Sequence, residues 1–188
     1  KVYNIVIRER NDKMKTMIEF VHERIKKNHY DIAVDFTMGN GHDTLLLSNL
    51  ANHVYSFDIQ EQALKKTKEL IGEKDNVELI LDSHENVDLY VDRFDVGVFN
   101  LGYLPSGDHQ ITTMSDSSVK AIKKAIELLN KGCCLYIVVY IGHEEGKRES
   151  AVIDEYVSGL DHRLFNVGMF KMLNKQGAPY VIMIEKRL

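Results

Sequence analysis

A glycine-rich turn follows the first buried apolar run of this sequence. Gly39, Asn40, Gly41 and His42 come shortly after the run at 32–36 and precede a helical pattern. Glycine lets the backbone pass close to a ligand, and the first turn of a helix has N–H groups without partners inside the helix. The same kind of turn joins strand to helix in proteins that bind nothing, so alone it is weak evidence. It predicts a ligand site only if other polar groups meet it.

Polar side chains also follow the next two apolar runs. Asp58 ends the second run with Gln60 two residues later, and Ser83 and His84 follow the third. Because the carboxyl ends of parallel strands share one edge of a sheet, we expect these side chains near the glycine turn. A carboxylate there can accept hydrogen bonds from both hydroxyls of a ribose, and the third strand end can meet an adenine. The three strand ends together predict a cofactor that contains a nucleoside.

A dinucleotide such as NAD is the competing interpretation of this site. Its fingerprint has a further glycine three residues after the second one, which lets helix and strand pack closely. That position is Thr44 here, and the sequence has no second loop of the pyrophosphate-binding kind. The glycine turn with Asp43 fits the methionine end of S-adenosylmethionine better than a dinucleotide. We therefore expect S-adenosylmethionine as the cofactor.

The fourth apolar run ends in the string Asn100-Leu101-Gly102-Tyr103-Leu104-Pro105. An Asn side-chain oxygen and a nearby backbone carbonyl can accept the hydrogens of an amine and hold its lone pair in line with a methyl group. An aromatic ring can stack on a nucleobase. The Asn-x-x-Tyr spacing is typical of methyltransferases that act on planar amine-bearing groups, so we expect Asn100 and Tyr103 to be catalytic. An ordinary turn with its tyrosine packed on the core is the competing interpretation.

The segment after the fifth apolar run opens at the same sheet edge. Tyr140 begins this segment, and His143 lies within it. A histidine there can take a proton from an ammonium substrate or contact a phosphate, so His143 is a third catalytic candidate. A loop histidine without a function fits the same pattern.

These residues depend on elements that alternate between strand and helix. Apolar runs predict strands at 32–36, 53–58, 77–81, 94–101, 132–141, 164–173 and 180–186, and helical spacing predicts helices at 14–27, 43–50, 60–70, 118–129 and 150–160. This alternation implies right-handed crossovers and a mostly parallel sheet with helices on both faces. The short turn at 174–177 predicts a terminal antiparallel hairpin. We expect one α/β domain over residues 1–188, with the Rossmann-like, seven-stranded fold of class I methyltransferases.

Composition restricts the class of protein further. The chain has 188 residues, 44% of them hydrophobic, and a net charge of -4, which describes a soluble domain of ordinary size. No apolar run approaches the ~20 residues of a membrane span, and residues 1–10 lack the pattern of a secretory signal, so we expect a cytoplasmic protein. Cys133 and Cys134 are neighbours and suit neither a disulfide nor a chelating pair, so we expect no metal.

Four segments resemble the small rRNA-methylase-like family of class I S-adenosylmethionine-dependent methyltransferases. They are Thr37-Met38-Gly39-Asn40-Gly41-His42-Asp43-Thr44, Phe57-Asp58-Ile59-Gln60, Phe99-Asn100-Leu101-Gly102-Tyr103-Leu104-Pro105 and residues 140–146. The resemblance covers nearly the whole chain, and the string from Asn100 to Pro105 is its most specific part. It implies methylation of the aminomethyl nitrogen of 5-aminomethyl-2-thiouridine at the wobble position of tRNA.

The resemblance also implies roles for individual residues. The methyl donor would contact Asn40, His42, Asp58, Gln60, Ser83 and His84, while Asn100 and Tyr103 would sit at the substrate, with Pro105, Gly107, Tyr140 and His143 on the side of the RNA. The chain departs from the family pattern at Ser106, usually Gly, at His109, usually Lys, and at Ile141 and Glu144, commonly Pro. The cofactor site therefore matches the family more closely than the RNA-facing loops do.

Three functions remain open on the sequence alone. The first is an N-methyltransferase that acts on the anticodon region of tRNA, and the second a methyltransferase for another RNA, such as rRNA, or for a small-molecule amine. The third is a nucleotide-binding module without catalysis, which would have no need of Asn100 and Tyr103. Basic residues gather in 13–27 and at 147–148. They favour RNA if they share a face with the site, and a small molecule if they do not. A homodimer also remains open.

Overall fold

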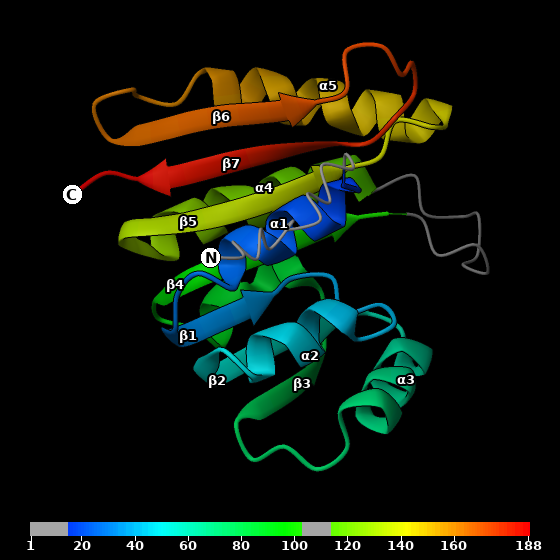
Figure 1. The fold of residues 1–188 in the computed structure, drawn as a ribbon, viewed down its shortest axis with the longest axis vertical. Helices are drawn as coiled ribbons and strands as arrows, with labels where there is room; N and C mark the ends of the chain where they lie inside the picture. The colour runs from blue at the N-terminus through cyan, green and yellow to red at the C-terminus, as the bar shows by residue number, and fades with distance from the viewer. Residues whose placement is uncertain (1–14, 103–113) are drawn as a thin grey trace, which may run out of the picture.

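Seven strands form one sheet in the order β3-β2-β1-β4-β5-β7-β6 (Figure 1). The computed structural model describes residues 15–102 and 114–188, except the side chains of residues 114–116. The strands are β1 (Tyr30–Asp35), β2 (Ala51–Asp58), β3 (Val77–Leu81), β4 (Phe94–Leu101), β5 (Leu129–Val139), β6 (Phe165–Lys171) and β7 (Tyr180–Lys186).

The first five strands are parallel, and the last two are not. β7 lies antiparallel between β5 and β6, which makes the β6–β7 pair a hairpin at the sheet edge. The strand order reverses between β1, which pairs with β2 on one side, and β4 on the other. Ligands of open α/β sheets bind at the carboxyl ends of the strands at such a reversal. The predicted Rossmann-like fold of class I methyltransferases, with its terminal antiparallel hairpin, is confirmed.

Helices cover both faces of this sheet. They are α1 (Met17–Ile25), α2 (His42–Ser48), α3 (Glu61–Ile71), α4 (Met114–Leu128), α5 (Glu144–Ser158) and the 3-10 helix η1 (His84–Leu89). Buried residues of α1 and α2 belong to one core, and those of α4 and α5 belong to a second core. In Figure 1, α1 and α2 lie in front of the sheet and α4 and α5 lie behind it.

The central strand β5 shows why one sheet supports two cores. Tyr136 and Val138 pack in the core of α1, whereas Leu135, Ile137 and Val139 pack in the core of α4 and α5. Successive side chains of a strand point to opposite faces, so a nearly continuous apolar run is needed to bury both. All five side chains are buried.

The helix after β5 begins earlier than the sequence predicts. α5 starts at Glu144 rather than at 150, because His143 caps it by accepting a hydrogen bond from the Gly146 N–H. Glycine disfavours a helix, so Gly146 indicated a loop. In the structure a Cβ at Gly146 would lie 2.2 Å from the carbonyl oxygen of Tyr140, so the close backbone approach requires glycine there. The segment between the predicted strand at 132–141 and the predicted helix at 150–160 therefore holds the first turns of α5.

Candidate functional site

The glycine turn after β1 has the backbone conformation that its sequence predicts. Gly39 and Gly41 both have positive φ, 53° and 82°, a region that favours glycine. A Cβ on Gly41 would lie within 3 Å of Thr67 atoms on α3, so the turn also packs tightly against that helix. Asn40 and His42 are exposed on this turn. The glycine conformations and the contact with α3 thus define the turn, and its two polar side chains are exposed at the carboxyl edge of the sheet.

Asp58 ties the end of β2 to the glycine turn. Its Oδ2 accepts a hydrogen bond from the Gly39 N–H at 3.0 Å, and its Oδ1 accepts one from the Gln60 N–H at 2.9 Å. Each carboxylate oxygen can accept more than one hydrogen bond, so both retain capacity for ligand hydroxyls. The structure therefore brings Gly39, Asp58 and Gln60 together, as the sequence predicts.

His84 adds an acceptor at the end of β3. Its Nδ1 lies 3.1 Å from the carbonyl oxygen of Phe36, which can only accept, so Nδ1 carries the proton. Burial lowers the pKa of His84, which keeps the ring neutral and leaves Nε2 as an acceptor. Nε2 is buried and has no hydrogen-bond partner in the part of the chain that the structure describes. Ser83 is the N-cap of η1 and accepts from the Glu85 N–H.

A buried carboxyl group forms hydrogen bonds with residues on both sides of the glycine turn. Asp35 is fully buried and accepts hydrogen bonds from the Thr44 hydroxyl at 2.6 Å and the Thr37 N–H at 3.1 Å. Thr44 in turn contacts the Ser56 hydroxyl at 2.7 Å. The pKa of Asp35 is raised to about 7, mainly because the group is buried and secondly because the Asp43 carboxylate lies nearby. The residue that replaces the third glycine of a dinucleotide site is therefore part of a polar network that joins β1, α2 and β2.

Asn100 is the last residue but one of β4, and different groups hold its backbone and its side-chain amide. Its N–H donates to the Thr37 hydroxyl at 2.7 Å, and its Nδ2 donates to Asp43 Oδ2 at 3.2 Å. The side-chain oxygen, Oδ1, is buried and has no hydrogen-bond partner among the described residues. A buried acceptor without a donor costs free energy, about 1–3 kcal/mol. Asn100 therefore presents an acceptor that a bound donor would satisfy.

Two residues at this position were not among the predicted site residues. Asp43, only 5% exposed, accepts from Asn100 on one oxygen and contacts His22 Nε2 at 2.5 Å on the other. His22 lies on α1, whose apolar spacing indicates only a core-facing helix. Asp43 is part of the glycine-turn motif, so its place after Gly41 was a usable signal. Nothing in the sequence around His22 indicates which strand end it reaches.

The segment after β5 lies at the same edge. A Cβ on Gly102 would lie 3.3 Å from the Tyr140 ring, so this ring packs against the end of β4. The pKa of Tyr140 is raised, mainly because the residue is buried and secondly because the Asp43 carboxylate repels the phenolate charge. His143 uses Nδ1 as an acceptor for the Gly146 N–H, so a neutral His143 ring carries its proton on Nε2. The predicted role of His143 as a base would require this capping hydrogen bond to break.

Three predicted site residues fall outside the described part of the chain. They are Tyr103, Pro105 and Gly107.

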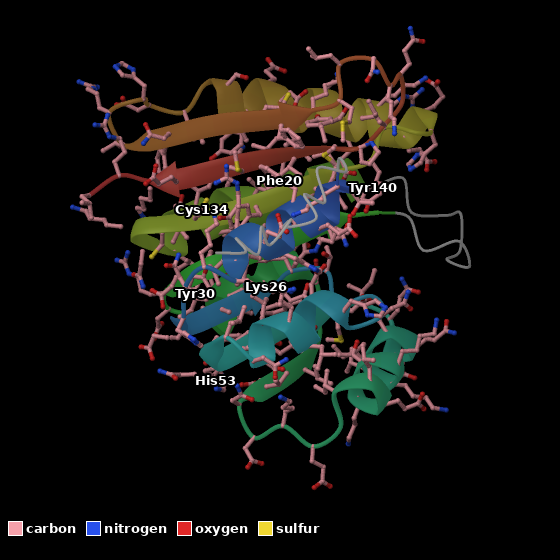
Figure 2. All side chains as sticks on the ribbon, viewed as in Figure 1. Phe20, Lys26, Tyr30, His53, Cys134 and Tyr140 are labelled. Atoms are coloured by element: carbon pink, nitrogen blue, oxygen red, sulfur yellow. The ribbon has the colours of Figure 1, made fainter. Side chains whose placement is uncertain are left out.

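The basic residues divide between the two edges of the sheet. Lys147 and Arg148 lie in the first turns of α5, which follows the carboxyl end of β5. Lys26 follows the end of α1, where the Tyr30 hydroxyl donates to the carbonyl oxygen of Ile25. Figure 2 shows Lys26 and Tyr30 away from Tyr140, toward the amino ends of the parallel strands. The 147–148 cluster therefore shares an edge with the site, whereas Lys26, at the end of α1, does not.

Other features lie away from this site. Cys133 and Cys134 are free, and the described residues contain no cluster of side chains suited to a metal ion. None of the described helices is long and apolar enough to cross a membrane. A cavity of about 410 Å³ lies between α5 and the β6–β7 hairpin, and none of the predicted site residues lines it.

Comparison with known proteins places the chain among RNA methylases. Residues 54–186 match the family described as "Putative rRNA methylase". The Arabidopsis thaliana protein named "tRNA (mnm(5)s(2)U34)-methyltransferase, chloroplastic" is 36% identical over 174 residues, which cover 84% of this chain and 64% of that protein. The chain therefore spans less than two thirds of the length of this relative.

Solved structures of similar proteins share the whole fold. A Clostridium thermocellum protein described as a "putative rRNA-methylase" is 36% identical with a TM-score of 0.87, covering 93% of this chain and 99% of that one. A Streptococcus mutans "putative methyltransferase", solved in complex with S-adenosylhomocysteine (SAH), is 41% identical with a TM-score of 0.84 and the same coverage. The resemblance stated from the motifs is confirmed: the chain belongs to the rRNA methylase family and has its class I methyltransferase fold.

Proposed function

We propose that this chain is an S-adenosylmethionine-dependent N-methyltransferase, and that its substrate is the aminomethyl group of wobble 5-aminomethyl-2-thiouridine in tRNA. The observation that carries the proposal is the buried Asn100 Oδ1, which has no donor among the described residues. It lies at the end of β4, beside the strand that leads into the glycine turn. An amine N–H is a donor that this acceptor can bind.

The residues at the strand ends fit S-adenosylmethionine. The lone pairs left on Asp58 suit the two ribose hydroxyls, and the free acceptor Nε2 of His84 suits the amino group of an adenine. The glycine turn, with Asn40 and His42, would hold the methionine end, and Gln60 and Ser83 complete the predicted set. The Streptococcus mutans relative, solved with SAH, supports the same choice. When bound, S-adenosylmethionine supplies a methyl group that is activated by a positively charged sulfur.

The chain's own contribution to the reaction is positioning. The substrate ammonium first loses one proton to solvent, which frees the lone pair of its nitrogen. Asn100 Oδ1 then accepts one N–H of this neutral amine and directs the lone pair at the methyl carbon. Transfer of the methyl group to this nitrogen would form a C–N bond and break the donor's C–S bond, whose electron pair would stay on sulfur. The products are SAH and a protonated secondary amine.

The tRNA substrate rests on the relatives and on the string after β4. The Arabidopsis relative is named for the methylated wobble nucleoside. Asn100, near the end of β4, begins the string that is the most specific part of the family resemblance. Arg148 and Lys147 at the same edge suit the phosphates of an RNA. An rRNA substrate is the second candidate, since the matching family and a Streptococcus thermophilus structure carry the rRNA methylase name.

Nucleoside analysis tests this proposal. The protein is incubated with S-adenosylmethionine and, in separate reactions, with tRNA and rRNA from cells lacking the activity, and the RNA is digested for mass spectrometry. We expect 5-aminomethyl-2-thiouridine to gain one methyl group and no other nucleoside to change. A methyl group found only in rRNA would support the second candidate. No methyl transfer to either RNA, by protein that binds SAH, would refute the proposal.

A further inference from the structure

We infer that His22 and Asp43 are positioning residues that set the orientation of the Asn100 amide, and thereby the chemical class of the methyl acceptor. This inference rests on the proposed function. The chain of contacts runs from His22 Nε2 to Asp43 Oδ1, and from Asp43 Oδ2 to Asn100 Nδ2. It joins α1, α2 and the end of β4.

The two ends of an Asn amide are nearly the same size but opposite in hydrogen bonding. Nδ2 can only donate, whereas Oδ1 can only accept. A carboxylate can only accept, so Asp43 can bond to Nδ2 and not to Oδ1. With Nδ2 held at 3.2 Å from Asp43 Oδ2, Oδ1 must occupy the other position of the amide. The free acceptor of the site is thus a consequence of the carboxylate beside it.

Asp43 itself needs a partner to keep this geometry. Its side chain is 7% exposed, and a buried carboxylate is stable only when its oxygens are paired. His22 supplies an N–H to the oxygen that Asn100 does not use. The His22 side chain is 22% exposed and sits on α1, which is fixed by the buried Met17, Val21 and Ile25. α1 therefore acts on Asn100 through Asp43.

The arrangement predicts which substrates the site accepts. A reacting nitrogen that still carries a hydrogen after losing its ammonium proton can donate to Oδ1 while its lone pair faces the methyl group. A methyl-accepting atom that carries no hydrogen, such as a ring nitrogen of a pyridine-like base, cannot donate to Oδ1. Oδ1 would stay unpaired, and its lone pairs would repel the lone pair of that nitrogen. The site should therefore select primary or secondary amines over such ring nitrogens.

A pair of substitutions at His22 tests the inference on the tRNA reaction. His22→Phe keeps a ring without the N–H, and His22→Gln offers an amide N–H to Asp43. We expect kcat for His22→Phe, counted per SAH-binding site, to fall about tenfold with an unchanged Kd for SAH. His22→Gln should recover most of this loss. The control His29→Phe alters an exposed histidine just before β1, at the opposite sheet edge, and should leave kcat unchanged.

A merely structural role for His22 gives a different result. Both His22 variants would then bind less SAH per molecule, while the kcat of the molecules that bind it stayed at the wild-type value. That result would overturn the inference, as would equal kcat values for wild type and His22→Phe.

A measurement without catalysis separates this inference from the proposed function. The side-chain NH2 signals of Asn100, assigned by their loss in Asn100→Ala, are recorded in 15N-labelled protein without substrate. We expect these signals to shift in Asp43→Ala and in His22→Phe, and to stay in place in His29→Phe. Shifts of this kind in a protein that methylates no tRNA would support the positioning pair and refute only the proposed substrate. If the Asn100 signals shift in neither Asp43→Ala nor His22→Phe, the inference about the positioning residues is refuted, whatever the tRNA assay shows.

Discussion

Asn100 is held by two residues that lie far from it in the sequence. Thr37, after β1, accepts from its backbone, and Asp43 on α2 accepts from its amide. The sequence could predict Asn100 as a site residue because the residues around it form a recognisable string at the end of an apolar run. It could not predict the orientation of the amide, since this depends on Asp43 and on His22 from a helix that precedes the sheet.

Removal of the Asn100 amide should separate cofactor binding from turnover. In Asn100→Ala we expect a Kd for SAH close to that of wild type, because the predicted cofactor contacts lie on the turn and at Asp58 and His84. The kcat for tRNA should fall about 100-fold, because the acceptor nitrogen loses its aligning partner. Binding calorimetry with SAH and a methylation time course measure the two effects. Loss of SAH binding would show that Asn100 belongs to the cofactor site.

The glycine turn offers a comparison between two kinds of cost. Gly41 and Gly177 both have positive φ, but a Cβ meets Thr67 at Gly41 and has open space at Gly177. Gly177→Ala should lose about 1–2 kcal/mol of unfolding free energy, the cost of a left-handed residue. Gly41→Ala should lose more and also weaken SAH binding, because the turn must move away from α3. Urea unfolding and SAH titration check this, and equal losses in both variants would contradict it.

At the scale of elements, apolar patterning predicts the order of strands and helices because it records which faces are buried. Helical spacing places Met17, Ile18, Val21 and Ile25 on one face of α1, and all but the half-buried Ile18 are buried. The predicted start of α5 was wrong by several residues, because a glycine at 146 disfavours a helix in sequence patterns. In the structure this glycine is required by the close approach of its backbone to the Tyr140 carbonyl. Such close contacts between backbone segments depend on the tertiary structure, so hydrophobic periodicity cannot predict them.

The Asp35 network that joins β1, α2 and β2 should make stability depend on pH. The pKa of Asp35 is raised to about 7 from the ordinary value of 3.8, so the folded protein keeps a proton that the unfolded chain has released. Between these two values the folded state binds more protons, so this group's contribution to stability falls as pH rises from about 4 to about 7. Asp35→Asn is neutral throughout and should remove this decline.

The measurement is the free energy of unfolding of both proteins in urea across that pH range. The difference between wild type and Asp35→Asn isolates the group, because other residues titrate in both proteins. A difference that stays constant from about pH 4 to about pH 7 would show that Asp35 is ionised in the folded state at low pH.

For the whole molecule, the division of basic residues between two edges decides where an RNA can lie. Composition predicts no broad RNA surface, since the net charge is -4. The structure leaves Lys147 and Arg148 at the edge of the site and places Lys26 near the opposite edge. The sequence showed both clusters but could not assign them to edges, because that depends on where α1 ends relative to β1.

This division predicts unequal effects of charge removal. Arg148→Ser should raise KM for tRNA about threefold to tenfold, the loss expected for one phosphate contact. Lys27→Ser, in the segment that leads into β1, should leave KM unchanged. The Kd for SAH should be the same in both variants. Steady-state methylation at fixed salt gives these values, and a larger effect at Lys27 would place the RNA on the other edge.

The most direct test of the central claim uses two tRNAs that differ only in the aminomethyl group of the wobble thiouridine. Both are incubated with the wild-type protein and S-adenosylmethionine that carries a labelled methyl group. The account predicts label only in the tRNA that has the amine, recovered on its wobble nucleoside after digestion. Equal labelling of the two tRNAs, or label on any other nucleoside, would contradict it.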